Sequence, residues 1–115
     1  MDKDRPIEEV CALLKSLLKD DTNQIIFCTG RVEDYREKTI EQINKILKGS
    51  KNIDIDSCLY MRPKGDYRKD FMVKRDLYKR MIFDGFNPVI VFEDKITVVE
   101  MWKEMGLKCL RVTGA

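Results

Sequence analysis

The segment that most constrains the fold is the run Val89-Ile90-Val91-Phe92, which ends abruptly at Glu93 and Asp94. An unbroken apolar run rich in β-branched residues is typical of a buried strand in a parallel sheet. Ligands of open α/β sheets bind at the carboxyl ends of the strands, so the acidic pair predicts a metal or proton-transfer site. The alternative is structural, because either carboxylate can cap the helix that follows.

Helical and strand-like patterns alternate along the rest of the chain. The spacing of apolar residues predicts helices at about 6–18, 32–48, 68–83 and 95–105, the last with Gly106 as its C-cap. Short apolar runs predict strands at about 24–29, 55–61, 89–92 and 108–112. Helices between such strands indicate right-handed crossovers, and we therefore expect an α/β domain over 1–115 with about four parallel strands.

Composition excludes several classes of protein. The chain has 115 residues, no histidine and four cysteines. Its apolar stretches are shorter than the ~20 residues of a membrane span, and its first residues do not resemble a secretory leader, so we expect a cytoplasmic protein without membrane contact. Without histidine the cysteines form no zinc-ligand pattern, and we expect buried, reduced thiols. Cys28, beside Thr29 and Gly30, is the candidate for a nucleophilic role.

Positive charge is concentrated in residues 62–80. This segment has eight basic and three acidic residues, a local charge of +5, whereas the whole chain carries +2. Arg62, Lys64 and Arg68 are nearest to the expected ligand-binding edge and are candidates for holding a polynucleotide strand. Lys79 and Arg80 fit an ordinary solvated helix face. Binding through phosphate contacts would weaken steeply with salt, unlike binding of a small phosphorylated metabolite.

Two further groups suit a phosphate at the same edge. Thr29-Gly30-Arg31 offers a hydroxyl, a guanidinium and backbone N–H groups at an expected helix start. Asp70 and Lys74 lie four residues apart on one helix face, where the lysine can reach the same phosphate. Alternatively, this pair is an exposed helix salt bridge that contributes about 0.2–0.5 kcal/mol.

A resemblance to a known family covers nearly the whole chain. It rests on Cys28-Thr29-Gly30-Arg31, on the series Arg62-x-x-Gly65-Asp66-x-Arg68-x-Asp70-x-x-x-Lys74, and on Glu93-Asp94 followed by Val98-Val99-Glu100-Met101-Trp102. In these segments the chain resembles the haloacid dehalogenase (HAD) superfamily and, within it, the 3′-phosphatase domain of phage polynucleotide kinase-phosphatases. The resemblance implies a three-layer, Rossmann-like sandwich and Mg²⁺-assisted phosphoryl transfer at phosphorylated ends of DNA or RNA.

The resemblance also implies a role for each matching residue. Thr29 matches the residue that hydrogen-bonds the phosphoryl group, and Arg31 matches an arginine that grips it. Lys74, held by Asp70, matches the lysine that neutralises the phosphate and the nucleophile. The pair Glu93-Asp94 matches the acidic residues that bind Mg²⁺, with glutamate where aspartate is common.

One element of the family pattern is not recognisable in the sequence. The family begins with an apolar strand ending in Asp-x-Asp-x-Thr, whose first aspartate attacks phosphorus and whose second is the general acid-base. Asp2-Lys3-Asp4 has the spacing, but it follows no strand and its place at a terminus is poorly suited to hold a nucleophile. We therefore expect an N-terminally truncated domain without the central strand, leaving unpaired edges on the strands that end at Thr29 and Glu93.

Three functions of different class remain open. The chain is the larger part of a phosphatase, inactive alone, whose nucleophile strand comes from a second polypeptide or an upstream segment. Alternatively, it is a non-catalytic module that binds a phosphorylated nucleic acid end, aided by stacking of Tyr67 or Phe71 on a base. In the third alternative it is a structural remnant that forms a homodimer through exposed strand edges.

Overall fold

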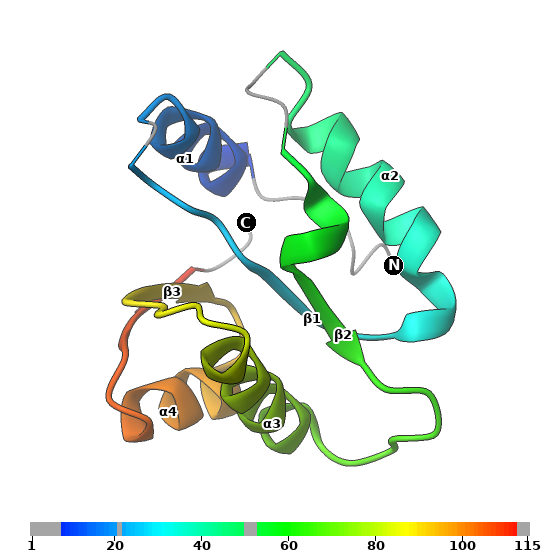
Figure 1. Ribbon diagram of the computed structural model, residues 1–115. Helices are drawn as coiled ribbons and strands as arrows, with labels where there is room; N and C mark the ends of the chain where they lie inside the picture. Colours follow the sequence, from blue (N-terminus) through cyan, green and yellow to red (C-terminus); the bar gives the residue numbers. More distant parts are fainter. Residues whose placement is uncertain (1–7, 21, 50–52, 113–115) are drawn as a thin grey trace.

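The computed structural model describes residues 8–20, 22–49 and 53–112 (Figure 1). Asp2 and Asp4, considered above as nucleophiles, lie outside the described residues. In chain order the elements are α1 (Glu8–Leu18), β1 (Phe27–Val32), η1 (Glu33–Tyr35), α2 (Arg36–Ile46), η2 (Ile55–Cys58), β2 (Leu59–Arg62), α3 (Asp70–Phe83), β3 (Ile90–Glu93), α4 (Ile96–Glu104) and β4 (Lys108–Arg111). Among the described residues, no helix combines the length and the apolar character needed to cross a bilayer.

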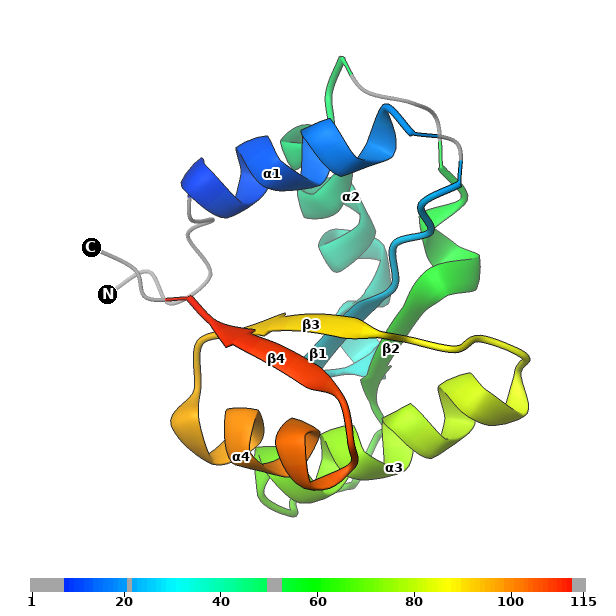
Figure 2. The same ribbon diagram turned by 90° about the vertical axis from the view of Figure 1, so that its left-hand side faces the viewer.

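The elements form three layers. In Figure 2, α1 and α2 lie above the strands, and α3 and α4 lie below them. Side chains of β2 alternate between the two outer layers, as expected for a strand in the middle layer. Leu59 and Met61 belong to the apolar cluster shared with α1 and α2, whereas Tyr60 packs with the apolar side chains of α3. This arrangement confirms the predicted α/β sandwich.

The four parallel strands are divided between two sheets. β1 pairs with β2, and β3 pairs with β4, both in parallel. Within the part of the chain that the structure describes, no strand hydrogen-bonds β1 to β3. The expected break beside the strands carrying Thr29 and Glu93 is therefore confirmed, and among the described residues each of these strands has one edge without a strand partner.

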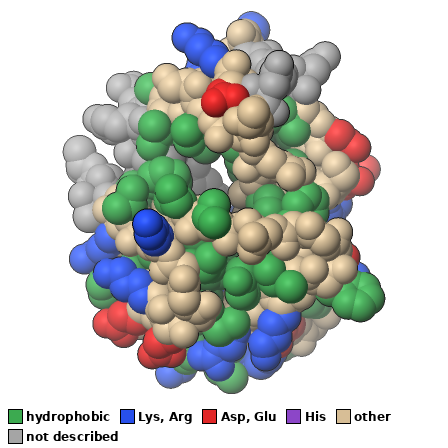
Figure 3. All heavy atoms as spheres, turned by 60° about the vertical axis from the view of Figure 1, so that its left-hand side comes forward, with side chains coloured by type: hydrophobic (Ala, Val, Ile, Leu, Met, Phe, Trp, Pro, Cys, Tyr) green, Lys and Arg blue, Asp and Glu red, His purple; other side chains and the backbone are tan. Residues whose placement is uncertain are grey.

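The strand β3, which begins at Ile90, is less buried than its apolar sequence predicts. In the register of β3 and β4, Val91 lies beside Cys109, and both pack on the apolar cluster of α4. The opposite face is open: Ile90 is 53% exposed and Leu110 is 56% exposed. On this side of the molecule, hydrophobic side chains gather around a hollow (Figure 3). The expectation of a buried strand was wrong because, within residues 8–20, 22–49 and 53–112, a helix packs against only one of its two faces.

Two segment boundaries also differ from expectation. β1 continues through Arg31 to Val32, with a shift of register after Thr29, so that α2 begins only at Arg36. The expected strand at 55–61 starts instead as the 3₁₀ helix η2. There the Ser57 hydroxyl donates to the Asp54 carbonyl at 3.0 Å, a local side-chain bond that competes with strand pairing.

Gly106 ends α4 as predicted. Its backbone has a φ of 88°, a conformation that residues with a Cβ rarely adopt. Its N–H donates to the Lys103 carbonyl at 3.0 Å, and the N–H of Leu107 donates to the Trp102 carbonyl at 3.1 Å. This pattern satisfies the last carbonyls of the helix and turns the chain into β4.

Met61 allows a direct test of the packing between layers, because its side chain is only 2% exposed. We expect Met61→Ala to lower the free energy of unfolding by about 2–5 kcal/mol through lost burial and a residual cavity. The matched control is Met72→Ala on α3, where the methionine is 36% exposed, and the cost should stay below about 1 kcal/mol. Urea unfolding of the two variants checks this, and equal losses would contradict the described layers.

Candidate active site

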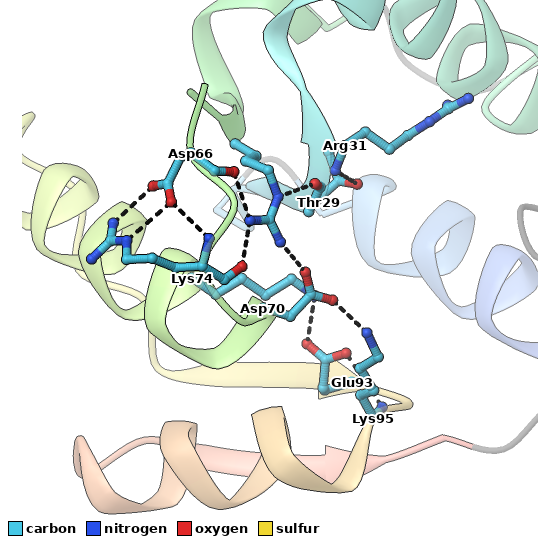
Figure 4. A network of polar contacts seen from close by, with 10 residues as sticks. Thr29, Arg31, Asp66, Asp70, Lys74, Glu93 and Lys95 are labelled. Carbon is cyan, nitrogen blue, oxygen red and sulfur yellow. Dashed lines mark hydrogen bonds and ion pairs between the residues drawn. The ribbon is translucent and has the colours of Figure 1, made fainter. Parts of the chain in front are cut away.

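Polar side chains converge at the carboxyl ends of the strands. The contributing residues are Thr29 on β1, Arg62 at the end of β2, Asp70 and Lys74 in the first turns of α3, and Glu93, Asp94 and Lys95 at and after β3. Figure 4 shows the network of hydrogen bonds and ion pairs that joins most of them. The predicted parallel topology is what brings these distant segments to one edge.

The half-buried Asp70 carboxylate links the two sheets. Arg62 Nη2 donates to its Oδ1 at 2.6 Å, and Lys95 Nζ donates to its Oδ2 at 2.7 Å. Burial tends to raise the pKa of this carboxyl, but the hydrogen bond from Lys95, the charge of Lys74 and the hydrogen bond from Arg62 outweigh it. The pKa of Asp70 therefore lies below its ordinary value, and the group is ionised at neutral pH.

Lys74 and Glu93 form a buried ion pair beside Asp70. Lys74 Nζ lies 3.2 Å from Glu93 Oε1, and both side chains are buried. The Trp102 indole N–H donates to the same Oε1 at 3.2 Å, while the backbone N–H groups of Asp94 and Lys95 donate to Oε2 at 3.3 and 3.4 Å. The alternative of an exposed salt bridge between Asp70 and Lys74 was therefore wrong. The ammonium group is buried and hydrogen-bonds Glu93, and it acts on Asp70 through its charge.

Arg62 braces the strand end, the following loop and the helix start. Its Nε donates to the Gly30 carbonyl at 2.8 Å. Its Nη1 donates to the carbonyls of Asp66 and Arg68, at 3.0 and 2.6 Å. Together with the bond to Asp70, Arg62 makes four hydrogen bonds from its three guanidinium nitrogens. Arg62, which was expected to hold a polynucleotide strand, is turned inward.

Arg68 is likewise engaged within the protein. Its guanidinium pairs with Asp66 and with Asp76, both at 2.8 Å. The hydrogen bond from the Arg68 side chain is the main cause that lowers the pKa of Asp66 to about 2. Of the three cations predicted to contact a polynucleotide, Lys64 and Arg68 are exposed, and Arg68 is already paired with two carboxylates.

Arg31 lies apart from the Asp70 group. Its Nη1 donates to Thr39 Oγ1 at 3.2 Å and to Gln42 Oε1 at 2.5 Å, both on α2. Its backbone N–H donates to Thr29 Oγ1 at 3.2 Å. Figure 4 shows its side chain extending away from Asp70, Glu93 and Lys95. Because β1 continues past Gly30, the expected helix start with free N–H groups does not form at this position.

Gly30 is required by the closeness of α3. A Cβ at this position would overlap Asp70 Oδ1 and lie 3.1 Å from Asp70 Cγ. The φ of Gly30 is not in the left-handed region, so the constraint is the space available rather than backbone conformation. The glycine lets the end of β1 approach the carboxylate that organises the edge.

The two carboxylates at the end of β3, those of Glu93 and Asp94, differ in their suitability for Mg²⁺. Both oxygens of Glu93 already accept hydrogen bonds, from Lys74 and Trp102 on one side and from backbone N–H groups on the other. The Asp94 side chain is exposed and offers the oxygen ligands that magnesium prefers. Across residues 8–20, 22–49 and 53–112, no group of three or more acidic, cysteine or histidine side chains is clustered to hold a metal ion. Of this pair, Asp94 is therefore the candidate magnesium ligand, whereas Glu93 anchors Lys74.

Cys28 on β1 is unsuited to nucleophilic catalysis. Burial, only partly offset by the charge of Lys74, raises the pKa of its thiol to about 12. The group is thus protonated at neutral pH, and the thiolate needed for attack is rare. All four cysteines are free.

Sequence reasoning missed three contributors to this site. Lys95 directly follows the acidic pair, and this adjacency was the available signal for its contact with Asp70. Trp102 is part of the recognised motif, but nothing in the spacing indicates that its indole reaches Glu93. Asp66, part of the recognised motif, holds Arg68.

Comparisons with known proteins give a consistent result. The family model described as "Polynucleotide kinase PNKP phosphatase domain" matches residues 1–115. A protein of Autographa californica nuclear polyhedrosis virus, named "Putative bifunctional polynucleotide kinase/RNA ligase", is 33% identical over 84 residues. The match covers 72% of this chain but 11% of that relative, so the chain spans about a tenth of the relative's length.

The fit of Gly30 against Asp70 can be tested by a double-mutant cycle. We expect Gly30→Ala to lower the free energy of unfolding by about 1–3 kcal/mol, because the added methyl group displaces the carboxylate. In an Asp70→Ala background the same change should cost much less, since the colliding oxygen is gone. Urea unfolding of the four proteins measures the coupling, and an equal cost in both backgrounds would rule out the contact.

The lowered pKa of Asp70 predicts a pH-dependent contribution to stability. The folded protein binds this proton less readily than the unfolded chain, whose carboxyl has the ordinary value of 3.8. The ionised carboxylate therefore stabilises the fold above about pH 4, and this stabilisation is lost as pH falls through the lowered pKa. We expect Asp70→Asn to cost about 1–3 kcal/mol near neutral pH and progressively less below pH 4. Urea unfolding at several pH values checks this; a pH-independent difference would contradict it.

Proposed function

We propose that this chain, which belongs to the polynucleotide kinase phosphatase domain family of the HAD superfamily, binds the phosphorylated end of a polynucleotide and supplies most of a phosphatase site. The observation that carries the proposal is the convergence of three cations on two part-buried or buried carboxylates at one strand edge. Arg62, Lys74 and Lys95 contact Asp70 or Glu93 there. Such fixed charges suit the negative charge of a transferring phosphoryl group.

Each residue has a defined part in this proposal. Lys74 neutralises a phosphate oxygen, and Glu93 keeps its ammonium group charged and in place. Thr29 donates its hydroxyl to a second oxygen. Arg31 reaches the phosphate only if it leaves its partners on α2. The family generally uses Mg²⁺; when bound at Asp94, the ion would supply further neutralisation of charge between the phosphate and the attacking group.

We further propose that an additional strand completes the site between β1 and β3. The support is the pair of strand edges that lack partners among the described residues. The strand would come from a second polypeptide or from a segment outside those residues, and it would carry the Asp-x-Asp-x-Thr series. Its first aspartate forms a bond to phosphorus as the bond to the 3′ oxygen breaks. The second gives a proton to that oxygen, and water then attacks phosphorus in the aspartyl phosphate, which releases inorganic phosphate and restores the aspartate.

A second candidate is binding without catalysis. It is favoured by the hydrogen bond between Lys74 and Glu93, because two buried charged groups that already pair with each other need no ligand to be stable. Exposed Lys64 and Lys69 would then contact the backbone of DNA or RNA, with affinity that falls steeply as salt is raised. In a third outcome, the free strand edges pair in a homodimer.

Phosphate release from a 3′-phosphorylated oligonucleotide tests the proposal. The full chain would be assayed with Mg²⁺, alone and with a peptide consisting of an apolar strand that ends in Asp-x-Asp-x-Thr. We expect release only with the peptide, and a loss of about 100-fold or more in Asp94→Asn. A peptide with asparagine in place of the first aspartate is the control and should give no release.

The other outcomes identify the alternatives. Release by the chain alone would show that the strand is not needed and direct attention to Asp2 or Asp4. If no mixture releases phosphate but the chain still binds the oligonucleotide in a phosphate-dependent manner, the chain is a non-catalytic binding module. Absence of both release and binding, with a dimer in solution, would favour the structural alternative.

A further inference from the structure

Tyr67 is an exposed aromatic residue in the loop that leads to Asp70 at the proposed phosphate site. It lies in the loop of residues 63–69 that joins β2 to α3, three positions before Asp70. Its side chain is 93% exposed, which is unusual for a large ring. A tyrosine with one accessible ring face can stack on a nucleobase of any sequence.

The backbone around Tyr67 is held in place on both sides. The carbonyls of the preceding Asp66 and the following Arg68 both accept hydrogen bonds from Arg62 Nη1, at 3.0 and 2.6 Å. The Asp66 carboxylate accepts from the Arg68 backbone N–H at 3.1 Å, and the Arg68 guanidinium is tied to Asp76 on α3 at 2.8 Å. The ring is therefore presented from a fixed loop, and a ligand would not have to order that loop in order to bind.

Phe71, the other candidate for stacking, is engaged elsewhere. It packs against the apolar cluster of α4, and the Arg75 guanidinium lies 5.7 Å from the centre of its ring. Tyr67 lacks such packing in the structure, being almost fully exposed. The structure thus separates two aromatic residues that the sequence leaves equivalent.

We propose that Tyr67 is the stacking platform for a nucleobase close to the phosphorylated end. This inference rests on the proposed function, because it takes the phosphate site as the second point of attachment. Arg62 contacts the loop on both sides of Tyr67 and, through Nη2, the Asp70 carboxylate at 2.6 Å. The same guanidinium therefore fixes the stacking ring relative to the phosphate site. The site selects a polynucleotide over a small phosphorylated metabolite, since only the polynucleotide engages both.

Binding by the full chain tests this inference. Fluorescence anisotropy would be measured with short single-stranded DNA and RNA carrying a 3′-phosphate, a 3′-hydroxyl, or a 3′-phosphate with the bases near that end removed. We expect Tyr67→Ala to bind the phosphorylated, base-containing strand about 10-fold more weakly, as loss of one stacked base predicts. Tyr67→Phe should bind like the unsubstituted chain, because stacking needs the ring and not the hydroxyl.

Phe83→Ala is the matched control. Phe83 is also a highly exposed aromatic residue, 86% exposed, but it ends α3, which has 14 residues. The far end of such a helix lies about 20 Å from its start. Its removal should change binding by less than about twofold, and Tyr67→Ala should have no effect on the strand without bases.

The arms separate failure of this inference from failure of the proposed function. Wild-type affinity of Tyr67→Ala, with the preference for a 3′-phosphate retained, would overturn the stacking role alone. A loss in Tyr67→Ala that is equal for the strand without bases would also overturn it. Absence of any preference for the 3′-phosphate in the unsubstituted chain would overturn the proposed function and, with it, the placement of the stacked base.

Discussion

The carboxylate of Asp70 joins the two halves of this protein. One of its oxygens is held by Arg62 from the first sheet, and the other is held by Lys95, which follows the second sheet. Since the structure shows no ladder between β1 and β3 in the described residues, this contact, the Lys74–Glu93 pair and the packing of α3 connect the halves. Lone surface ion pairs add little stability, and the Lys95 side chain is 61% exposed. Arg62, Asp70 and the Lys74–Glu93 pair are mostly shielded from water, where leaving one charge unpaired is costly.

The same interactions that hold the sheets together also define the chemistry of the edge. A buried ammonium group is tolerated here because Glu93 pairs with it, and Glu93 is in turn fixed by an indole and two backbone N–H groups. The cost of burying this charged group is thus offset inside the protein before a ligand arrives. In the proposed function, this preformed pair holds the Lys74 ammonium group in position beside the phosphate without rearrangement.

Much of the fold follows from the sequence. The periodicity around Val73, Leu77 and Met81 predicts α3, and these residues are buried together. The strand ending at Glu93 and the C-cap at Gly106 are also found where the patterns place them. The 3₁₀ helix at 55–58 is missed because a local bond to the Asp54 carbonyl outweighs strand propensity. Exposure of Ile90 is missed because an apolar run does not reveal whether both faces of a strand are covered.

The site is predicted as a set of positions but not as a set of contacts. The sequence indicates that Asp70, Lys74 and Glu93 meet at one edge; the choice of partners depends on distances that spacing does not encode.

The contacts of Arg62 limit which residues can stand at position 62. Its four hydrogen bonds come from all three guanidinium nitrogens, Nε, Nη1 and Nη2. A lysine has three donors on a single atom, so it cannot span the strand end, the loop and the helix start at once. Replacing Arg62 by lysine, although it keeps the charge, would therefore lose contacts to at least one of these three segments. A change at position 62 thus requires compensating changes in the strand end, the loop and the helix start.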